Sequence, residues 1–213
     1  MKTDDLVTML ATGVEAAEVD ALARRYSMAI GWGALGATLL MALMLGVRQD
    51  IGRAVLEPMF WVKLGYVACL AATGLFALSR LSLPGRRLTG VPAALATPLL
   101  LIGLLALIVL GEANPNERQV LLFGKTWTTC PLMIAALSVP MFVAVTWAIR
   151  GLAPTRLSLA GGAAGLASGA FGAIVYSLHC QEMEAPFLAT WYSLGMLTPT
   201  AIGALLGPRL LRW

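Results

Sequence analysis

Residues 176–187, with the sequence YSLHCQEMEAPF, gather a histidine, a cysteine and two glutamates in a short gap between two long apolar runs. A second cysteine ends the stretch TWTTC, just before another apolar run. A thiolate reacts with oxidants, and together with imidazole it binds soft cations such as zinc, copper or cadmium. The candidate sensor and metal-binding residues are therefore Cys130, His179, Cys180, Glu182 and Glu184.

These residues by themselves do not decide among three interpretations of Cys130 and Cys180. Outside the cytosol thiols oxidise readily, so one is a static disulfide between two loops. The second is a redox or metal sensor, which exposure of both thiols at a water boundary would favour. The third, catalytic thiol exchange, ranks last because the chain has no C-x-x-C motif, and we expect no enzyme. Cys69 lies within an apolar run and is interpreted as a small apolar residue.

The elements that position these groups must lie in a membrane. Of 213 residues, 59% are hydrophobic and only 12% are charged, which is outside the usual mix of a soluble domain. A helix needs about 20 apolar residues to cross a bilayer. Runs of that length occur at 27–47, 59–79, 91–111, 131–149, 159–178 and 187–207. We therefore predict an all-α integral membrane protein, a bundle of six transmembrane helices.

Basic residues orient these spans, because cytoplasmic loops carry the excess of Lys and Arg. With six crossings, both termini lie on one side of the membrane. That side has the larger number of basic residues: Lys2, Arg24, Arg25, Arg80, Arg86, Arg87, Arg150, Arg156, Arg209 and Arg212. The smaller set lies on the other side: Arg48, Arg53, Lys63, Arg118 and Lys125. Both termini are thus predicted in the cytoplasm and both candidate thiols outside it. Lys63, near the outer edge of its span, is interpreted as an anchor that reaches the headgroups.

The opening segment, 1–26, is a candidate docking helix. Asp4 and Asp5 suit the first turn of a helix, and the apolar stripe that follows consists of Leu6, Met9, Leu10 and Val14. Its polar face is acidic, so an anionic membrane surface would repel it, whereas an apolar groove rimmed by basic residues would accept it. A merely solvated tail stays an alternative. The predicted division is a tail (1–26), a membrane domain (27–207) and a C-terminal tail (208–213).

Small residues mark one span as a close-packing element. Gly161, Gly165, Gly169 and Ala173 recur every four residues, which lets another helix approach closely. Packing within the bundle is favoured, and a homo-oligomer stays open.

Three stretches of the chain resemble a known family. The opening KTDDLVTMLA, the motif TWTTCP and the run HCQEMEAPFLATWYSLGM are similar to the NrsF-type negative regulators of extracytoplasmic-function sigma factors. The likeness covers essentially the whole chain, although Cys69 is not part of the family pattern. It implies an anti-sigma factor that holds a cytoplasmic sigma factor at the bacterial inner membrane. It also implies that Cys130 and Cys180 matter for the response to stress.

The resemblance implies that two predicted parts act together: a thiol detector on the outer side of the membrane and a docking helix on the cytoplasmic side. We expect metal or oxidative stress at the two cysteines to release the sigma factor, with no required cofactor and no direct contact with nucleic acid. Membrane lipids and a heavy-metal ion are the other expected partners. The alternative is a small metal or solute transporter. It is disfavoured because Lys63 is the only Asp, Glu, Lys, Arg or His within the six predicted spans.

Overall fold

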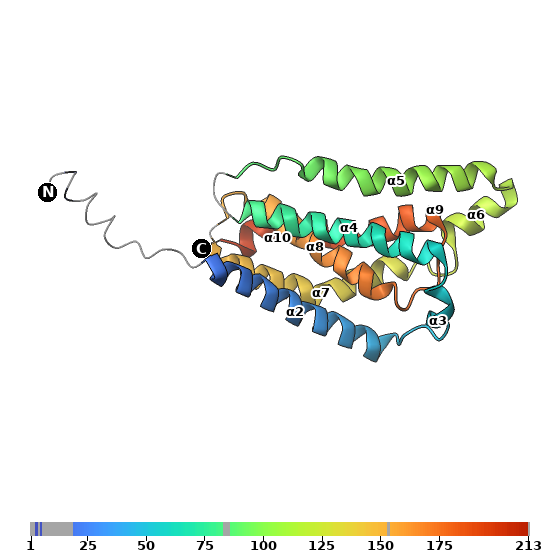
Figure 1. Cartoon of the computed structure of the whole chain (residues 1–213), viewed down its shortest axis with the longest axis horizontal. Helices are drawn as coiled ribbons and strands as arrows, with labels where there is room; N and C mark the ends of the chain where they lie inside the picture. Colours follow the sequence, from blue (N-terminus) through green and yellow to red (C-terminus); the bar gives the residue numbers. More distant parts are fainter. Residues whose placement is uncertain (1–2, 4, 6–18, 83–85, 153, 213) are drawn as a thin grey trace.

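The computed structural model describes the chain except for residues 1–2, 4, 6–18, 83–85, 153 and 213. All regular structure in the described part is helical, and the long helices lie along one common direction (Figure 1). Among the described residues, five helices are long and apolar enough to cross a membrane. They are α2 (Val19–Met44), α4 (Pro58–Leu81), α5 (Val91–Glu112), α7 (Cys130–Ile149) and α8 (Leu157–Tyr176). The expected all-α fold is thereby confirmed, and these five helices are candidates for the predicted membrane spans.

The last predicted span is helical but interrupted. It consists of α9 (Ala185–Phe187), the π-helix η2 (Leu188–Tyr192) and α10 (Ser193–Leu210), which follow one another directly. Two prolines, Pro199 and Pro208, lie inside α10. Because α10 is not among the five helices that meet the length and hydropathy criteria, a sixth crossing stays a prediction.

The helix boundaries differ most from expectation near the polar segments. α2 begins at Val19, so residues 19–26 of the predicted tail continue into the first long helix. The predicted outer loops contain two short helices, α3 (Ile51–Ala54) and α6 (Pro115–Phe123). A 3-10 turn, η1 (Arg150–Leu152), follows α7. Of the predicted docking residues, Asp5 is helical and exposed. The others, Asp4, Leu6, Met9, Leu10 and Val14, lie outside the described residues.

The glycine-rich helix α8 lies at the centre of the bundle, where it packs against α10, α4 and α7. A Cβ atom added at Gly165 would collide with the carbonyl oxygen of Pro199 on α10, and one at Gly161 with that of Gly203. On another side of α8, a Cβ at Gly74 of α4 would lie 2.6 Å from the backbone nitrogen of Ala167. The small residues therefore serve packing inside the bundle, as the sequence favoured, while a homo-oligomer stays a prediction.

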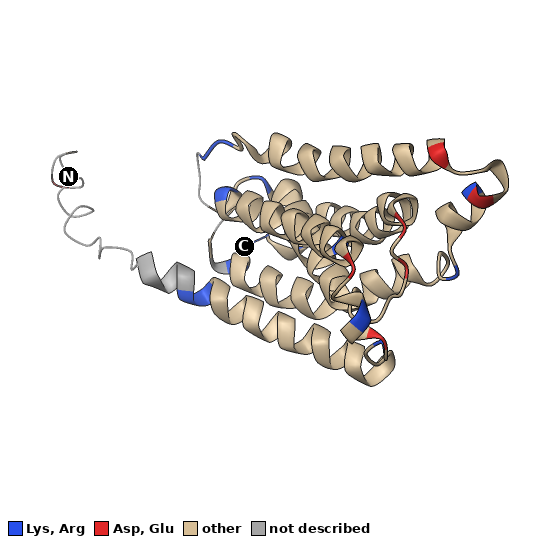
Figure 2. Ribbon diagram, turned by 45° about the vertical axis from the view of Figure 1, so that its right-hand side comes forward, with Lys and Arg blue, Asp and Glu red and all other residues tan. Residues whose placement is uncertain are grey.

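The two ends of the bundle differ in charge. At the tail end, where α2 begins and α10 ends, Arg25 donates to the carbonyl of Trp147 and Arg150 to that of Leu210. The opposite end, here called the thiol end, carries α3, α6 and α9 (Figure 1). Acidic residues gather there (Figure 2): Asp50, Glu57, Glu112, Glu117, Glu182 and Glu184. The acidic loops thus lie at the thiol end, beside the smaller basic set of Arg48, Arg53, Arg118 and Lys125.

Candidate thiol site

The fold brings Cys130 and Cys180 together at the thiol end. Cys130 is the first residue of α7, and the backbone N–H of Cys180 donates to the carbonyl of Tyr176, the last residue of α8 (2.9 Å). Since α7 packs against α8, the two side chains meet, and their thiols interact. Both are free thiols. The two cysteines therefore form one site although they come from distant parts of the sequence.

The expectation that both thiols are exposed is wrong. Cys130 is 0% exposed and Cys180 is 2% exposed. Both belong to one apolar cluster with Tyr176, Phe187 and Tyr192, because the loop after α8 folds back over the helix ends. Cys69, interpreted from the sequence as a small apolar residue of its span, is exposed on the outer surface of α4.

Lys63 is buried beside the thiols and does not reach the surface. It lies in the second turn of α4 and is 0% exposed. Its Nζ donates to the carbonyl oxygens of Cys180 (3.1 Å) and Glu182 (2.9 Å) and lies 4.8 Å from the ring centroid of Tyr192. The interpretation of Lys63 as a headgroup anchor is therefore wrong. The sequence held one signal, since an ionisable residue inside an apolar span is expected to be functional.

A second cation, Arg48, holds the same loop. It is 8% exposed and donates from Nη1 to the carbonyl oxygen of Cys180 (3.3 Å). Its Nε and Nη2 also donate to the two carboxylate oxygens of Asp50, each at 2.7 Å. This bidentate pairing lowers the pKa of Asp50 from 3.8 to about 2. The Cys180 carbonyl is consequently held by two cations, of which only Arg48 has a carboxylate partner among the described residues.

The other predicted metal ligands are directed elsewhere. The Nδ1–H of His179 donates to the carbonyl oxygen of Gly46 (2.9 Å), and the Glu182 carboxylate accepts from the backbone N–H of Lys125 (2.8 Å). Glu184 is exposed ahead of α9. Within the described residues no three His, Cys, Asp or Glu side chains are close enough to hold a metal ion. The structure thus brings together Cys130 and Cys180 alone, and metal binding there stays a prediction.

The surroundings of Cys180 favour its thiolate. The neighbouring Cys130 thiol has the largest influence, and the positive charge of Lys63 adds to it. Together they hold the pKa of Cys180 below the ordinary value of a thiol, against the opposing effect of burial. Tyr192 is itself fully buried, and its hydroxyl makes no well-directed hydrogen bond.

A polar cavity leads to Cys180. It has a volume of about 580 Å³, and its lining includes Arg48, Lys125, His179, Cys180 and Glu182. Cys130 is not among the residues that line it. Of the two cysteines, Cys180 is therefore the one that borders the cavity.

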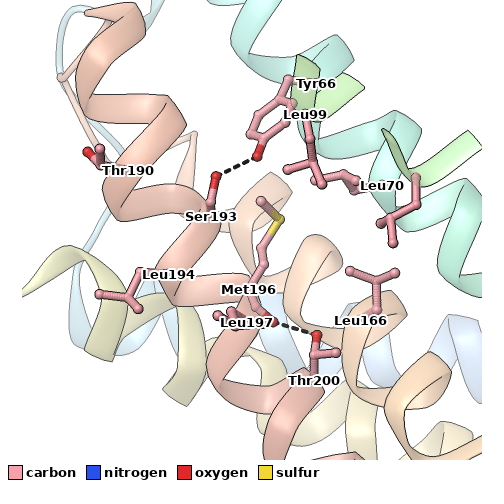
Figure 3. A pocket seen from close by; sticks show the side chains of 11 residues that line it. Tyr66, Leu70, Leu99, Leu166, Thr190, Ser193, Leu194, Met196, Leu197 and Thr200 are labelled. Carbon is pink, nitrogen blue, oxygen red and sulfur yellow. Dashed lines mark hydrogen bonds between the residues drawn. The ribbon is translucent and has the colours of Figure 1, made fainter. Parts of the chain in front are cut away.

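A separate cavity of about 410 Å³ lies between α4, α5, α8 and α10 (Figure 3). Leucines and Met196 form most of its wall. Its polar groups are satisfied locally: the hydroxyls of Tyr66 and Ser193 bond each other at 2.7 Å, and Thr200 donates to the carbonyl of Met196 at 2.7 Å. No residue lining it is an acid, a base or a cysteine, so it offers no second chemical site.

Comparison with known proteins identifies the family. The family model described as "Negative regulator of sigma F" matches residues 10–213. The chain is 58% identical over 213 residues to a protein of Azospira oryzae named "Probable anti-sigma-F factor NrsF", with both chains covered completely. It is 41% identical over 216 residues to "Anti-sigma-F factor NrsF" of Caulobacter vibrioides, again over both full lengths. No solved structure matches. The chain therefore belongs to the NrsF family of negative regulators of sigma F, a regulatory class and not an enzyme class.

Proposed function

We propose that this chain holds an extracytoplasmic-function sigma factor at the cytoplasmic face of the bacterial inner membrane and releases it when Cys130 and Cys180 are modified. The N-terminal segment, with Asp4, Asp5, Leu6, Met9, Leu10 and Val14, is the docking element in this proposal. The thiol site is the detector. The two curated relatives are named as anti-sigma-F factors, which supports a sigma factor as the partner.

The observation that carries the proposal is the separation of the two functional parts. The thiol site lies at one end of the bundle, and the N-terminal segment enters α2 at the other end (Figure 1). Six crossings with both termini in the cytoplasm would place the thiols in the periplasm and the docking segment beside the transcription machinery. This arrangement suits a protein that reports an external chemical signal to an internal partner.

Two kinds of signal fit the chemistry of the site. A soft divalent cation such as Cd²⁺ would bind both sulfurs as thiolates and displace the remaining thiol protons. A peroxide would instead join the two sulfurs in a disulfide and be reduced to water, taking up the two electrons and two protons that the thiols lose. Because the described residues offer two sulfurs and no third ligand nearby, ions that accept two thiolates suit the site better than ions that require four protein ligands.

Either reaction can supply much of the free energy that release of the sigma factor requires. Shifting a partner from almost fully bound to almost fully free requires the two states to differ by about 5 kcal/mol in affinity. Closing a disulfide contributes about 2–4 kcal/mol, and binding of a metal to thiolates can contribute more. A modified thiol site could therefore supply most of the free energy that release demands.

A transport function has less support. A solute path needs ionisable or polar side chains along its length. Lys63 is engaged with two backbone carbonyls, and the cavity between α4, α5, α8 and α10 has an almost wholly apolar wall. No specific feature of the described residues favours a transporter.

The docking half is tested with the full chain in detergent micelles, captured through a C-terminal tag from cytoplasmic extract. We expect the wild type to retain a sigma factor, identified by mass spectrometry, and the double variant Leu6→Ala with Leu10→Ala to lose it. Leu104→Ala with Leu107→Ala is the matched control, because both residues are exposed on α5. Equal recovery by all three proteins would contradict docking through the tail.

A further inference from the structure

We propose that a basic cavity at the tail end binds the phosphate groups of an anionic phospholipid. The cavity has a volume of about 370 Å³ and lies where α4 ends and α8 begins. Four of the residues that line it are arginines: Arg80, Arg86, Arg87 and Arg156. The inference requires that α4, α5 and α8 lie in a membrane, and it is independent of the sigma factor and of the thiol site.

The four arginines come from three parts of the chain. Arg80 lies in the last turn of α4, and Arg156 directly precedes α8. Arg86 and Arg87 lie in the segment that leads to α5. Because α4 packs against both α5 and α8, these three segments meet at the tail end of the bundle (Figure 1). The fold therefore gathers around one cavity positive charges that are dispersed along the sequence.

Within the described part of the chain, these arginines lack an acidic partner. None of the four has a carboxylate within 4.0 Å among those residues, and no Asp or Glu lines the cavity. The contact of Arg80 is with a neutral ring, that of Phe76, 4.9 Å from the ring centroid. By contrast, Arg25 and Arg150 at the same end each donate to a backbone carbonyl. Like charges around one cavity repel one another, so an anion bound between them would be stabilising.

The chemistry of the cavity wall favours a phosphate that carries apolar groups. A guanidinium group can donate two parallel hydrogen bonds to a phosphate, which gives both affinity and orientation. A volume of about 370 Å³ lies within the range of small-molecule sites. Two leucines, Leu81 and Leu88, also line the cavity, and both belong to the apolar packing at this end of the bundle. A phospholipid matches both parts of the wall, with its phosphate at the arginines and its glycerol ester region at the leucines.

The position of the cavity favours a lipid over a soluble anion or an acidic protein surface. α4, α5 and α8 each meet the length and hydropathy criteria for a membrane span. The ends of such spans lie at the depth of the lipid headgroups. Basic pockets between transmembrane helices bind anionic headgroups at that depth. A bound lipid would therefore hold the end of α4, the segment before α5 and the beginning of α8 together.

The test is a titration of the purified full chain in detergent micelles with cardiolipin, followed by native mass spectrometry. We expect the unchanged protein to bind cardiolipin at least about tenfold more tightly than phosphatidylcholine with the same acyl chains. Arg80→Gln with Arg156→Gln should weaken cardiolipin binding by at least about tenfold, since each arginine beside an anionic headgroup contributes about fivefold. Arg209→Gln with Arg212→Gln is the matched control. It removes the same charge from exposed positions outside the cavity and should leave the affinity unchanged.

A second cavity variant keeps the test decisive if the first does not fold. Arg86→Gln with Arg87→Gln changes two exposed residues of the same wall and should also weaken cardiolipin binding by at least about tenfold. Cardiolipin should stay bound in inorganic phosphate at the ionic strength at which it stays bound in potassium chloride, because the site recognises the lipid and not the free anion.

Equal cardiolipin affinity of a folded cavity variant and the control variant would overturn the proposal. Displacement of cardiolipin by inorganic phosphate, but not by potassium chloride, would also overturn it, because a soluble anion would then be the ligand. If the cavity variants lose a captured sigma factor but keep their cardiolipin affinity, the arginines bind a protein partner and the proposal fails. The lipid titration itself needs no sigma factor, so its failure and failure of the docking proposal can be told apart.

Discussion

The hydroxyl of Tyr26 lies 2.5 Å from the Oγ of Ser82, which joins the beginning of α2 to the residue that follows α4. Lys63 lies near the opposite end of the same helix, α4, where it holds the loop that contains Cys180. One continuous helix therefore contacts both the thiol site and the segment from which the N-terminal tail emerges. A shift of α4 caused at the thiols would reach Tyr26 directly, without passing through other elements.

Loss of the hydrogen bond between Tyr26 and Ser82 should weaken signalling more than docking. In Tyr26→Phe we expect normal retention of the sigma factor at rest but reduced release after Cd²⁺ treatment, because α4 and α2 lose a contact of about 1 kcal/mol. Release is measured as the fraction of sigma factor set free from nanodiscs. Ser79→Ala is the control, since its hydroxyl is exposed and bonds only to the Phe76 carbonyl. Release equal to wild type in Tyr26→Phe would argue against α4 as the connection.

The contact between α8 and α10 should tolerate no side chain at Gly165. Alanine there places a methyl group against the Pro199 carbonyl, so Gly165→Ala should destabilise the protein by about 1–3 kcal/mol. Gly103→Ala on α5 is the control, because nothing lies within 4 Å of its Cβ position. That change should be neutral or stabilise by about 0.5–1 kcal/mol. Thermal unfolding followed by circular dichroism measures both, and equal stability of the two variants would contradict the close approach.

The pairing of Arg48 with Asp50 should make the thiol end sensitive to acid. The pKa of Asp50 is about 2 in the folded chain, below the ordinary value of 3.8, so the pairing favours the folded form above about pH 4. This contribution is lost as the pH falls from about 4 to 2. The unfolding temperature should therefore drop more steeply across that interval in wild type than in Asp50→Asn. Parallel curves would show that the pairing does not stabilise the folded chain.

The two thiols should react in a fixed order. Cys180 lines the cavity of about 580 Å³ and lies beside Lys63, whereas Cys130 is 0% exposed and does not line that cavity. A small maleimide should consequently label Cys180 at least tenfold faster than Cys130, as measured by peptide mass spectrometry over time. An impermeant maleimide applied to intact spheroplasts should reach Cys180 as well, if the thiol end faces outward. Faster labelling of Cys130 would contradict this order. Protection of Cys180 in spheroplasts would contradict an outward-facing thiol end.

Hydropathy was sufficient to predict five of the long helices. Apolar runs locate a span to within a few residues because the bilayer fixes its length. Hydropathy did not indicate the π-helical turn at 188–192, which interrupts the last predicted span. The stripe of Gly161 and Gly165 correctly indicated close packing. It could not indicate that α10 was the partner, because spacing along one helix does not identify its neighbour.

The side chains of the site were harder to predict than the spans. Hydropathy gives the depth of a residue in the membrane but not the side of the helix on which it lies. Lys63 was therefore assigned to the headgroups although it points into the bundle. His179 and Glu182 were grouped with Cys180 by sequence proximity, yet each bonds the backbone of another segment, Gly46 and Lys125 respectively. Only tertiary packing decides between these directions.

The most direct test is release of the sigma factor by modification of the two cysteines. Nanodiscs carrying the full chain and its bound sigma factor are treated with Cd²⁺, and the free sigma factor is measured after separation. The account predicts that the wild type and Cys69→Ser release it, while Cys130→Ser and Cys180→Ser retain it at every Cd²⁺ concentration that does not unfold the protein. Equal release from Cys130→Ser, Cys180→Ser and the wild type would contradict detection at this site.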